Sequence, residues 1–106
     1  MYLLLHPKTM GEVLAAFPQL VASFARREPG SDEVLLDAFL EHAEWSHPTS
    51  WTEARKARDK RPKLNLFWVG NGRIRQNIYR VGVRGWKELD ATVGVRRADR
   101  IAGRTT

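Results

Sequence analysis

The sequence predicts an α+β fold with three N-terminal helices, a β-hairpin after them and a short C-terminal helical segment. Three observations carry this prediction. Apolar residues recur at three- and four-residue steps through the first half, as one buried face of an α-helix requires. Residues that cap helices precede each of these stripes. The pair Asn71-Gly72 then separates two strand-like runs, which is the strongest short-range signal of a hairpin.

The first helix is expected to begin at Thr9. Thr9 and Glu12 have the spacing of a capping box, in which each side chain satisfies the backbone N–H of the other residue. The apolar stripe that follows consists of Met10, Val13, Leu14, Phe17, Leu20, Val21 and Phe24. Pro18 lies inside this stripe and cannot donate to the carbonyl four residues back. The helix therefore either kinks there or restarts with Pro18 in its first turn.

Two further helices are predicted before Pro62. Ser31 is the expected N-cap of the second, which has two acidic residues in its first turn. Ser50 and Glu53 form a second capping box, which starts the third helix at Trp51. The basic residues of this third segment are Arg55, Lys56, Arg58, Lys60 and Arg61. Its apolar edge is mostly alanine, so the helix can lie close to its support while its other side stays charged.

The hairpin spans residues 63 to 81. A type I′ turn at Asn71-Gly72 places Val69 opposite Ile74 on the face expected to be buried. The same register places Trp68 opposite Arg75 on the other face, where a cation–π contact is expected. Two strands alone are marginally stable in water, so residues 1–5 are a candidate third strand.

A short helix is expected after the hairpin. Gly85-Trp86 leads into it, and Trp86, Leu89 and Val93 share one side at helical spacing. Gly94 ends it, and residues 95–106 form either a last basic helix or a loose tail.

The charge is divided unevenly within one expected domain, residues 1–106. The acidic helical half, residues 1–50, holds three basic against seven acidic side chains, a net charge of −4. The basic half, residues 51–106, holds 15 against five, a net charge of +10. This asymmetry favours a polyanionic partner. The competing explanation is a base composition of the genome that enriches arginine codons. Such a bias would not leave the first half of the chain so poor in arginine.

Several classes of function are disfavoured by the residues present. There are no cysteines, which excludes disulfides and thiol chemistry. No run of about 18 apolar residues could cross a membrane, so no membrane partner and a cytoplasmic location are expected. His42 has Glu41 and Glu44 nearby, but the step to His47 does not share a helical face, so no metal site and no cofactor are expected. Phosphate chemistry of the small toxin-type ribonuclease kind would use arginines of the hairpin, but no general base is evident near them.

The tryptophans have two interpretations. Trp45 and Trp51 flank a helix junction and are expected to be core or staple residues. Trp68 and Trp86 neighbour arginines and could stack on bases or fill a pocket of a protein partner.

The order of helix, helix, basic helix and glycine-tipped hairpin over residues 10–83 resembles a winged helix–turn–helix DNA-binding domain. The segment "GNGRIRQNIYRV" is similar to the wing of phage and plasmid regulatory or replication proteins. The resemblance implies that "WTEARKARDKR" is the recognition helix, with Arg55, Lys56 and Arg58 in the major groove. Asn71 and the arginines after it would lie near phosphate or the minor groove. "WSHPTS" departs from the family, because it is longer than the usual turn before that helix.

These observations predict a non-enzymatic nucleic-acid-binding protein, a regulator or accessory factor for which DNA is the favoured ligand. The residues expected to bind are Arg55, Lys56, Arg58, Arg61, Trp68, Asn71, Arg73, Arg75 and Arg80. The alternative is an inhibitor of phage or mobile-element type that docks its basic face on an acidic protein surface. Monomer and homodimer both remain open.

Overall fold

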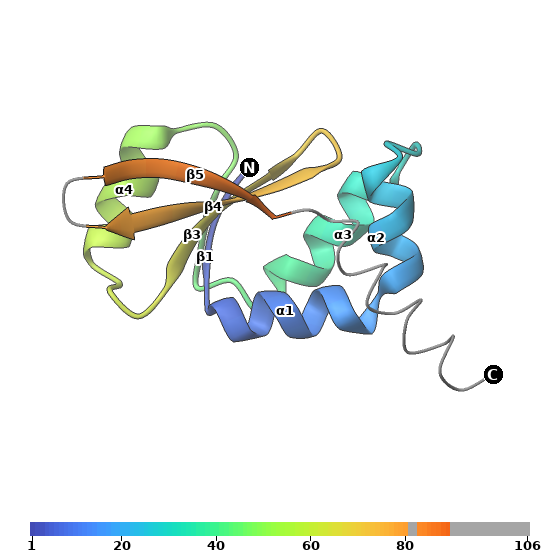
Figure 1. The fold of residues 1–106 in the computed structure, drawn as a ribbon, viewed down its shortest axis with the longest axis horizontal. Coiled ribbons are helices and arrows are strands. Elements are labelled where there is room, and N and C mark those ends of the chain that lie inside the picture. The colour runs from blue at the N-terminus through green and yellow to red at the C-terminus, as the bar shows by residue number, and fades with distance from the viewer. Residues whose placement is uncertain (81–82, 90–106) are drawn as a thin grey trace.

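Five antiparallel strands form one sheet that carries helices on both faces (Figure 1). The computed structural model describes residues 1–80 and 83–89. The elements in chain order are β1 (Tyr2–Leu5), α1 (Pro7–Ala16), α2 (Pro18–Ala25), α3 (Ser31–Leu40), β2 (Trp45–His47), α4 (Trp51–Asp59), β3 (Asn65–Gly70), β4 (Arg73–Arg80) and β5 (Val83–Leu89). The strand order is β2-β1-β3-β4-β5. In Figure 1, α2 and α3 lie at one end of the molecule and α4 at the other.

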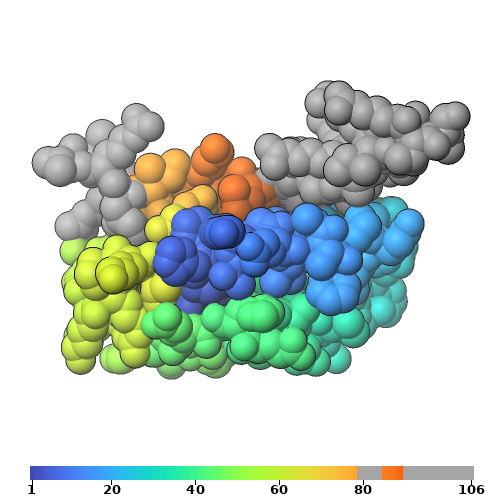
Figure 2. All heavy atoms as spheres, turned by 90° about the horizontal axis from the view of Figure 1, so that it is seen from below, coloured from blue at the N-terminus to red at the C-terminus, as the bar shows by residue number. Residues whose placement is uncertain are grey.

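Each face of the sheet has its own core, because successive side chains of a strand point to opposite faces. The larger core packs α1, α2 and α3 on the sheet and contains Leu3, Leu5, Met10, Val13, Val21, Phe24, Leu35, Phe39, Phe67, Val69 and Ile74. The smaller core packs α4 on the opposite face and contains Leu4, Ala54, Ala57, Leu64 and Leu66. Figure 2 shows the side on which α1 is exposed, between α2 and the chain around the end of α4.

The first helical stripe is two helices. Pro18 opens α2 in its first turn, so the restart is confirmed. The predicted start at Thr9 is wrong, because α1 already begins at Pro7 and no side chain caps it. Proline at the first helical position lacks only an N–H that would have no helical partner, and its fixed φ suits the helix. Thr9 therefore lies inside the first turn.

The two serine caps have different outcomes. Ser31 is not an N-cap: it is the first residue of α3, Gly30 precedes it with φ +81°, and its hydroxyl donates to the carbonyl of Glu28 at 2.7 Å. Ser50 is confirmed as the N-cap of α4, where its hydroxyl accepts the backbone N–H of Glu53 at 3.2 Å.

A strand, β2, occupies part of the segment expected to be a loop between α3 and α4. It pairs with β1, with Leu3 opposite Ser46. The imidazole Nδ1 of His47 accepts the backbone N–H groups of Thr49 at 3.2 Å and Ser50 at 2.9 Å. The histidine thus holds the turn that leads from β2 into α4.

The hairpin and its third strand are confirmed. β3 and β4 pair with Val69 opposite Ile74 and Trp68 opposite Arg75, and β1 runs along the other side of β3. The tip packs against the end of α2, where a Cβ on Gly72 would lie 2.8 Å from the carbonyl oxygen of Phe24. There, Nε of Arg27 donates to the carbonyl of Asn71 at 3.0 Å.

The predicted fold class is wrong in its C-terminal part. Residues 83–89 are not helical but form β5, which pairs along β4 with Arg75 opposite Glu88 and Asn77 opposite Trp86. The described residues therefore contain four helices and five strands, with no C-terminal helical segment. The unpaired edge of β4 explains the difference, because its backbone groups gain hydrogen bonds from a neighbouring strand. Val93, Gly94 and residues 95–106 lie outside the described residues.

Candidate nucleic-acid interface

The α4 face of the sheet is only partly covered by its helix. α4 packs on β1 and β3, and its buried positions Ala54 and Ala57 allow a close approach to Leu4 and Leu66. On the same face, β4 and β5 continue past the helix and present Arg75 and Trp86. The arrangement leaves a space along the side of α4, with the helix as one wall and the outer strands as the floor.

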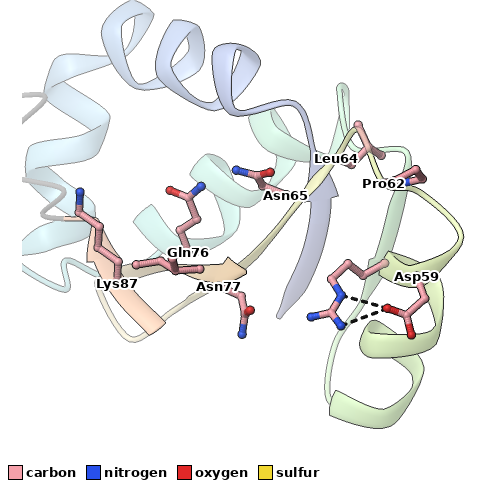
Figure 3. A pocket seen from close by; sticks show the side chains of 9 residues that line it. Asp59, Pro62, Leu64, Asn65, Gln76, Asn77 and Lys87 are labelled. Atoms are coloured by element: carbon pink, nitrogen blue, oxygen red, sulfur yellow. Dashed lines mark hydrogen bonds and ion pairs between the residues drawn. The ribbon is translucent and has the colours of Figure 1, made fainter. Parts of the chain in front are cut away.

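Two adjoining hollows fill this space, and a third adjoins them. The first, of about 350 Å³, is lined by Tyr2, Trp51, Trp68, Arg75 and Trp86. The second, of about 130 Å³, shares Trp51 and Trp86 with the first and adds Arg55, Arg58, Asn77 and Gly85. The third, of about 730 Å³, shares Arg58 and Asn77 with the second but extends to Asn65, Gln76 and Lys87, which belong to the opposite face of the sheet (Figure 3).

Because the first two hollows share Trp51 and Trp86, they form one groove. We call it the α4 groove and define it by Tyr2, Trp51, Arg55, Arg58, Trp68, Arg75, Asn77 and Trp86.

One end of the α4 groove is aromatic. Ring centroids lie 4.7 Å apart for Tyr2 and Trp68, 6.0 Å for Tyr2 and Trp51, and 5.6 Å for Trp51 and Trp86. The planes of these pairs are tilted by 48° to 59°, and all three distances lie in the range of about 4.5–7 Å that is favourable for aromatic pairs. Trp86 is 39% exposed, so one ring of the cluster is open to solvent.

Cationic side chains line the same groove. Neither Arg55 nor Arg75 forms an ion pair with another residue in the described part of the chain. Arg58 reaches Asp59, with Nη2 3.1 Å from Oδ1. The groove therefore carries two guanidinium groups without an ion-pair partner in this part of the structure, beside open aromatic surface.

Arg73 lies beside the groove on the same face of β4. Its Nε is 3.7 Å from Oε1 of Glu88, and both side chains are half exposed. The carboxylate of Glu88 thus offsets part of the positive charge of Arg73 beside the groove.

Four of the predicted binding residues, Arg55, Arg58, Trp68 and Arg75, are brought together in the α4 groove. Lys56 is exposed on α4 outside the groove lining.

The other predicted residues lie elsewhere. Nη1 of Arg61 donates to the carbonyl of Ala57 at 3.1 Å, so it satisfies a carbonyl in the last turn of α4. Asn71 lines a separate hollow at the hairpin tip, together with Asp32 and Glu33 of α3. Arg80 is the last residue of β4.

Sequence reasoning missed three residues of the groove. Tyr2 and Asn77 were not singled out as binding residues. Trp51 was expected as a core or staple residue, and it does pack against the smaller core, but it also lines the groove. Asn77 could have been found, because it follows Arg73 and Arg75 at the two-residue steps of one strand face. Trp86 was noted for stacking but was placed on a helix.

Within residues 1–80 and 83–89, no group of three histidine or acidic side chains could hold a metal ion. No helix in this part of the chain is long and apolar enough to cross a membrane. The winged-helix resemblance stays a prediction. Comparisons of the chain with protein-family models, with curated proteins and with solved structures find no match.

Proposed function

We propose that this protein binds nucleic acid without catalysing a reaction on it, and that it acts as a regulator or accessory factor. The observation that carries the proposal is the α4 groove, which places Arg55 and Arg75 in an aromatic cluster whose Trp86 ring is exposed. Guanidinium groups form charge-assisted hydrogen bonds with phosphate, and aromatic rings stack with bases. The two kinds of side chain thus complement the two parts of a nucleotide.

The distribution of charge along the chain supports the same ligand. Most of the groove residues belong to α4, β3, β4 and β5, which lie in the half of the chain with a net charge of +10. A positive field of this kind steers polyanions toward the groove and adds affinity by releasing counterions from the nucleic acid.

An acidic protein surface is the competing partner, because arginine and tryptophan also anchor protein interfaces. Added nucleic acid distinguishes these two possible partners. A nucleic-acid-binding groove is occupied by many oligonucleotides, whereas an inhibitor binds one protein and is little affected by them.

The first experiment measures the affinity of the full chain for labelled single-stranded and duplex oligonucleotides by fluorescence anisotropy at 50 and 200 mM salt. If about three phosphates of a single strand are neutralised, the affinity should fall by roughly 20-fold between these concentrations. No binding at the lower salt concentration would refute the proposal and favour an acidic protein partner.

A pair of double variants then locates the site. Replacing Arg55 and Arg75 by alanine should weaken binding at least tenfold and flatten the salt dependence. The matched control replaces Lys8 and Arg26, which are exposed on the helical side, and should bind as the unmodified protein does. Arg27 is unsuitable as a control, because it holds the carbonyl of Asn71. A larger loss in the control would place the binding surface on the N-terminal helices.

A further inference from the structure

We infer that the α4 groove selects single-stranded nucleic acid, by stacking one unpaired base on Trp86 and hydrogen-bonding the edge of that base with the side chain of Asn77. This inference rests on the proposed function, since it specifies how the same groove recognises its ligand.

Asn77 is the first observation. It is only 6% exposed, yet its side-chain amide has no hydrogen-bond partner among the described residues. Asn77 lines two of the three hollows, and Figure 3 shows its side chain pointing away from that of Gln76, its neighbour in β4. No completely buried side-chain nitrogen or oxygen in the described part lacks a partner, so the Asn77 amide must open onto the groove. A nearly buried amide that faces a groove without a partner is suited to bind a polar ligand.

Trp86 is the second observation. It lies directly opposite Asn77 on β5, and side chains opposite each other in an antiparallel pair have Cβ atoms about 5 Å apart. Ring contacts with Trp51 and Tyr2, at 5.6 and 6.4 Å, hold the Trp86 indole on the groove floor. A base stacked on the exposed indole would therefore have its edge within reach of the Asn77 amide.

The ring geometry defines how a base can bind. The four ring pairs in contact are tilted by 45° to 59°, so none of these four pairs is a parallel pair that could enclose a base. Trp86 is the exposed ring of the cluster, so it is the ring on which we place the base. In a duplex, bases are already stacked and their pairing edges are occupied, so only an unpaired base can bind in this way without being flipped out.

The charge of the groove excludes another ligand class. Aromatic clusters also bind quaternary ammonium groups through cation–π contacts. Here the guanidinium of Arg75 lines the same hollow as Tyr2, Trp51, Trp68 and Trp86, and it would repel a cation. A planar base joined to a phosphate fits both the rings and the positive charge.

The Asn77 amide predicts a preference among bases. A carboxamide offers one acceptor oxygen and an NH₂ group with two hydrogens to donate, and it pairs best with a base edge that has the complementary pattern. Stacking alone tolerates every base. Stacking strength alone gives only modest differences between bases, so a preference that follows the hydrogen-bonding pattern of the base edge should depend on Asn77.

The test measures binding of the full chain to four kinds of ligand of equal length. These are single-stranded DNA homopolymers, the matching RNA homopolymers, an abasic DNA strand and a DNA duplex. The base-containing single strands should bind at least tenfold more tightly than the abasic strand and the duplex. The DNA and RNA arms show whether the sugar matters. Equal affinity for abasic, duplex and base-containing strands would overturn the inference and leave the proposed function standing, whereas no binding to any ligand would overturn both.

Variants test the two residues separately. Trp86→Ala should lower the affinity for single strands to that for the abasic strand, and Trp86→Phe should retain most of it. Phe17→Ala is the matched control, because Phe17 is 46% exposed at the junction of α1 and α2, and it should change nothing. Asn77→Leu, which keeps the branched shape of the side chain without its amide, should reduce the differences between homopolymers to those of stacking alone without affecting the abasic strand. A homopolymer ranking unchanged in Asn77→Leu would overturn the assignment of Asn77.

Discussion

Substituting Gly72 by alanine should destabilise the protein strongly, because two independent costs coincide at the hairpin tip. Gly72 has φ +72°, a conformation that costs an L-residue about 1–2 kcal/mol. An added Cβ would lie 2.8 Å from the carbonyl oxygen of Phe24 and 2.9 Å from Cγ of Arg27. The carbonyl belongs to the backbone of α2 and cannot rotate away, so relief of the overlap costs about 1–3 kcal/mol more. The expected loss is about 2–5 kcal/mol.

Urea unfolding followed by circular dichroism measures this loss. With a slope of about 1.5–2 kcal/mol per molar urea, the midpoint should fall by roughly 1–3 M. Two glycines serve as controls, because neither would bring a Cβ within 4 Å of another atom. Gly30→Ala, at φ +81°, should show only the conformational cost of about 1–2 kcal/mol. Gly11→Ala, inside α1, should stabilise the protein by about 0.5–1 kcal/mol.

The difference in stability loss between Gly72→Ala and Gly30→Ala tests whether the hairpin tip packs on α2. If Gly72→Ala is no more destabilising than Gly30→Ala, the backbone contact with Phe24 contributes nothing. The hairpin tip would then not be packed on α2, and the placement of Asn71 at that end of the molecule would be wrong.

Three further predictions concern the start of α4, the first residue and the charge beside the groove. Ser50→Ala should cost about 0.5–2 kcal/mol in urea unfolding, because the N–H of Glu53 loses its acceptor, whereas Thr9→Ala should change little; equal effects would contradict these helix starts. Burial lowers the pKa of the Met1 α-amino group from 8.0 to about 5, so between these values the unfolded chain binds a proton that the folded chain does not. Stability should therefore rise from pH 5 to pH 8, and this part of the rise should disappear after N-terminal acetylation; an identical pH profile would refute the assignment. Glu88→Gln should raise the affinity for oligonucleotides a few-fold, since it removes the carboxylate that lies 3.7 Å from Arg73, and unchanged binding would mean that the groove does not feel that charge.

Features that depend on a few neighbouring residues were predictable from the sequence. The Asn71-Gly72 turn determines which residues of β3 and β4 lie opposite each other, because a two-residue loop leaves little choice of register. Pro18 restarts a helix and Ser50 caps one, since both effects act within a single turn. The division of charge between the two halves of the chain also follows directly from the sequence.

Where two neighbouring sequence signals favour different structures, the sequence did not show which of them would determine the structure. Thr9 has the correct spacing for a cap, but Pro7 starts the helix earlier. Trp86 and Leu89 fit a helical period as well as a strand, because a run this short satisfies both. The unpaired edge of β4 is what favours the strand, and it exists only after β3 and β4 have paired.

The α4 groove is the part that only the tertiary structure determines. Its residues come from β1, α4, β3, β4 and β5, which are brought side by side by pairing between distant segments and by the packing of α4 on the sheet. Tyr2 and Trp68 are far apart in the sequence, yet their rings lie 4.7 Å apart because β1 pairs with β3. The composition shows that arginine and tryptophan are plentiful in the second half of the chain. Strand order determines which of them meet, because strand neighbours are selected by hydrogen bonding and burial across the whole sheet and not by adjacency in the sequence.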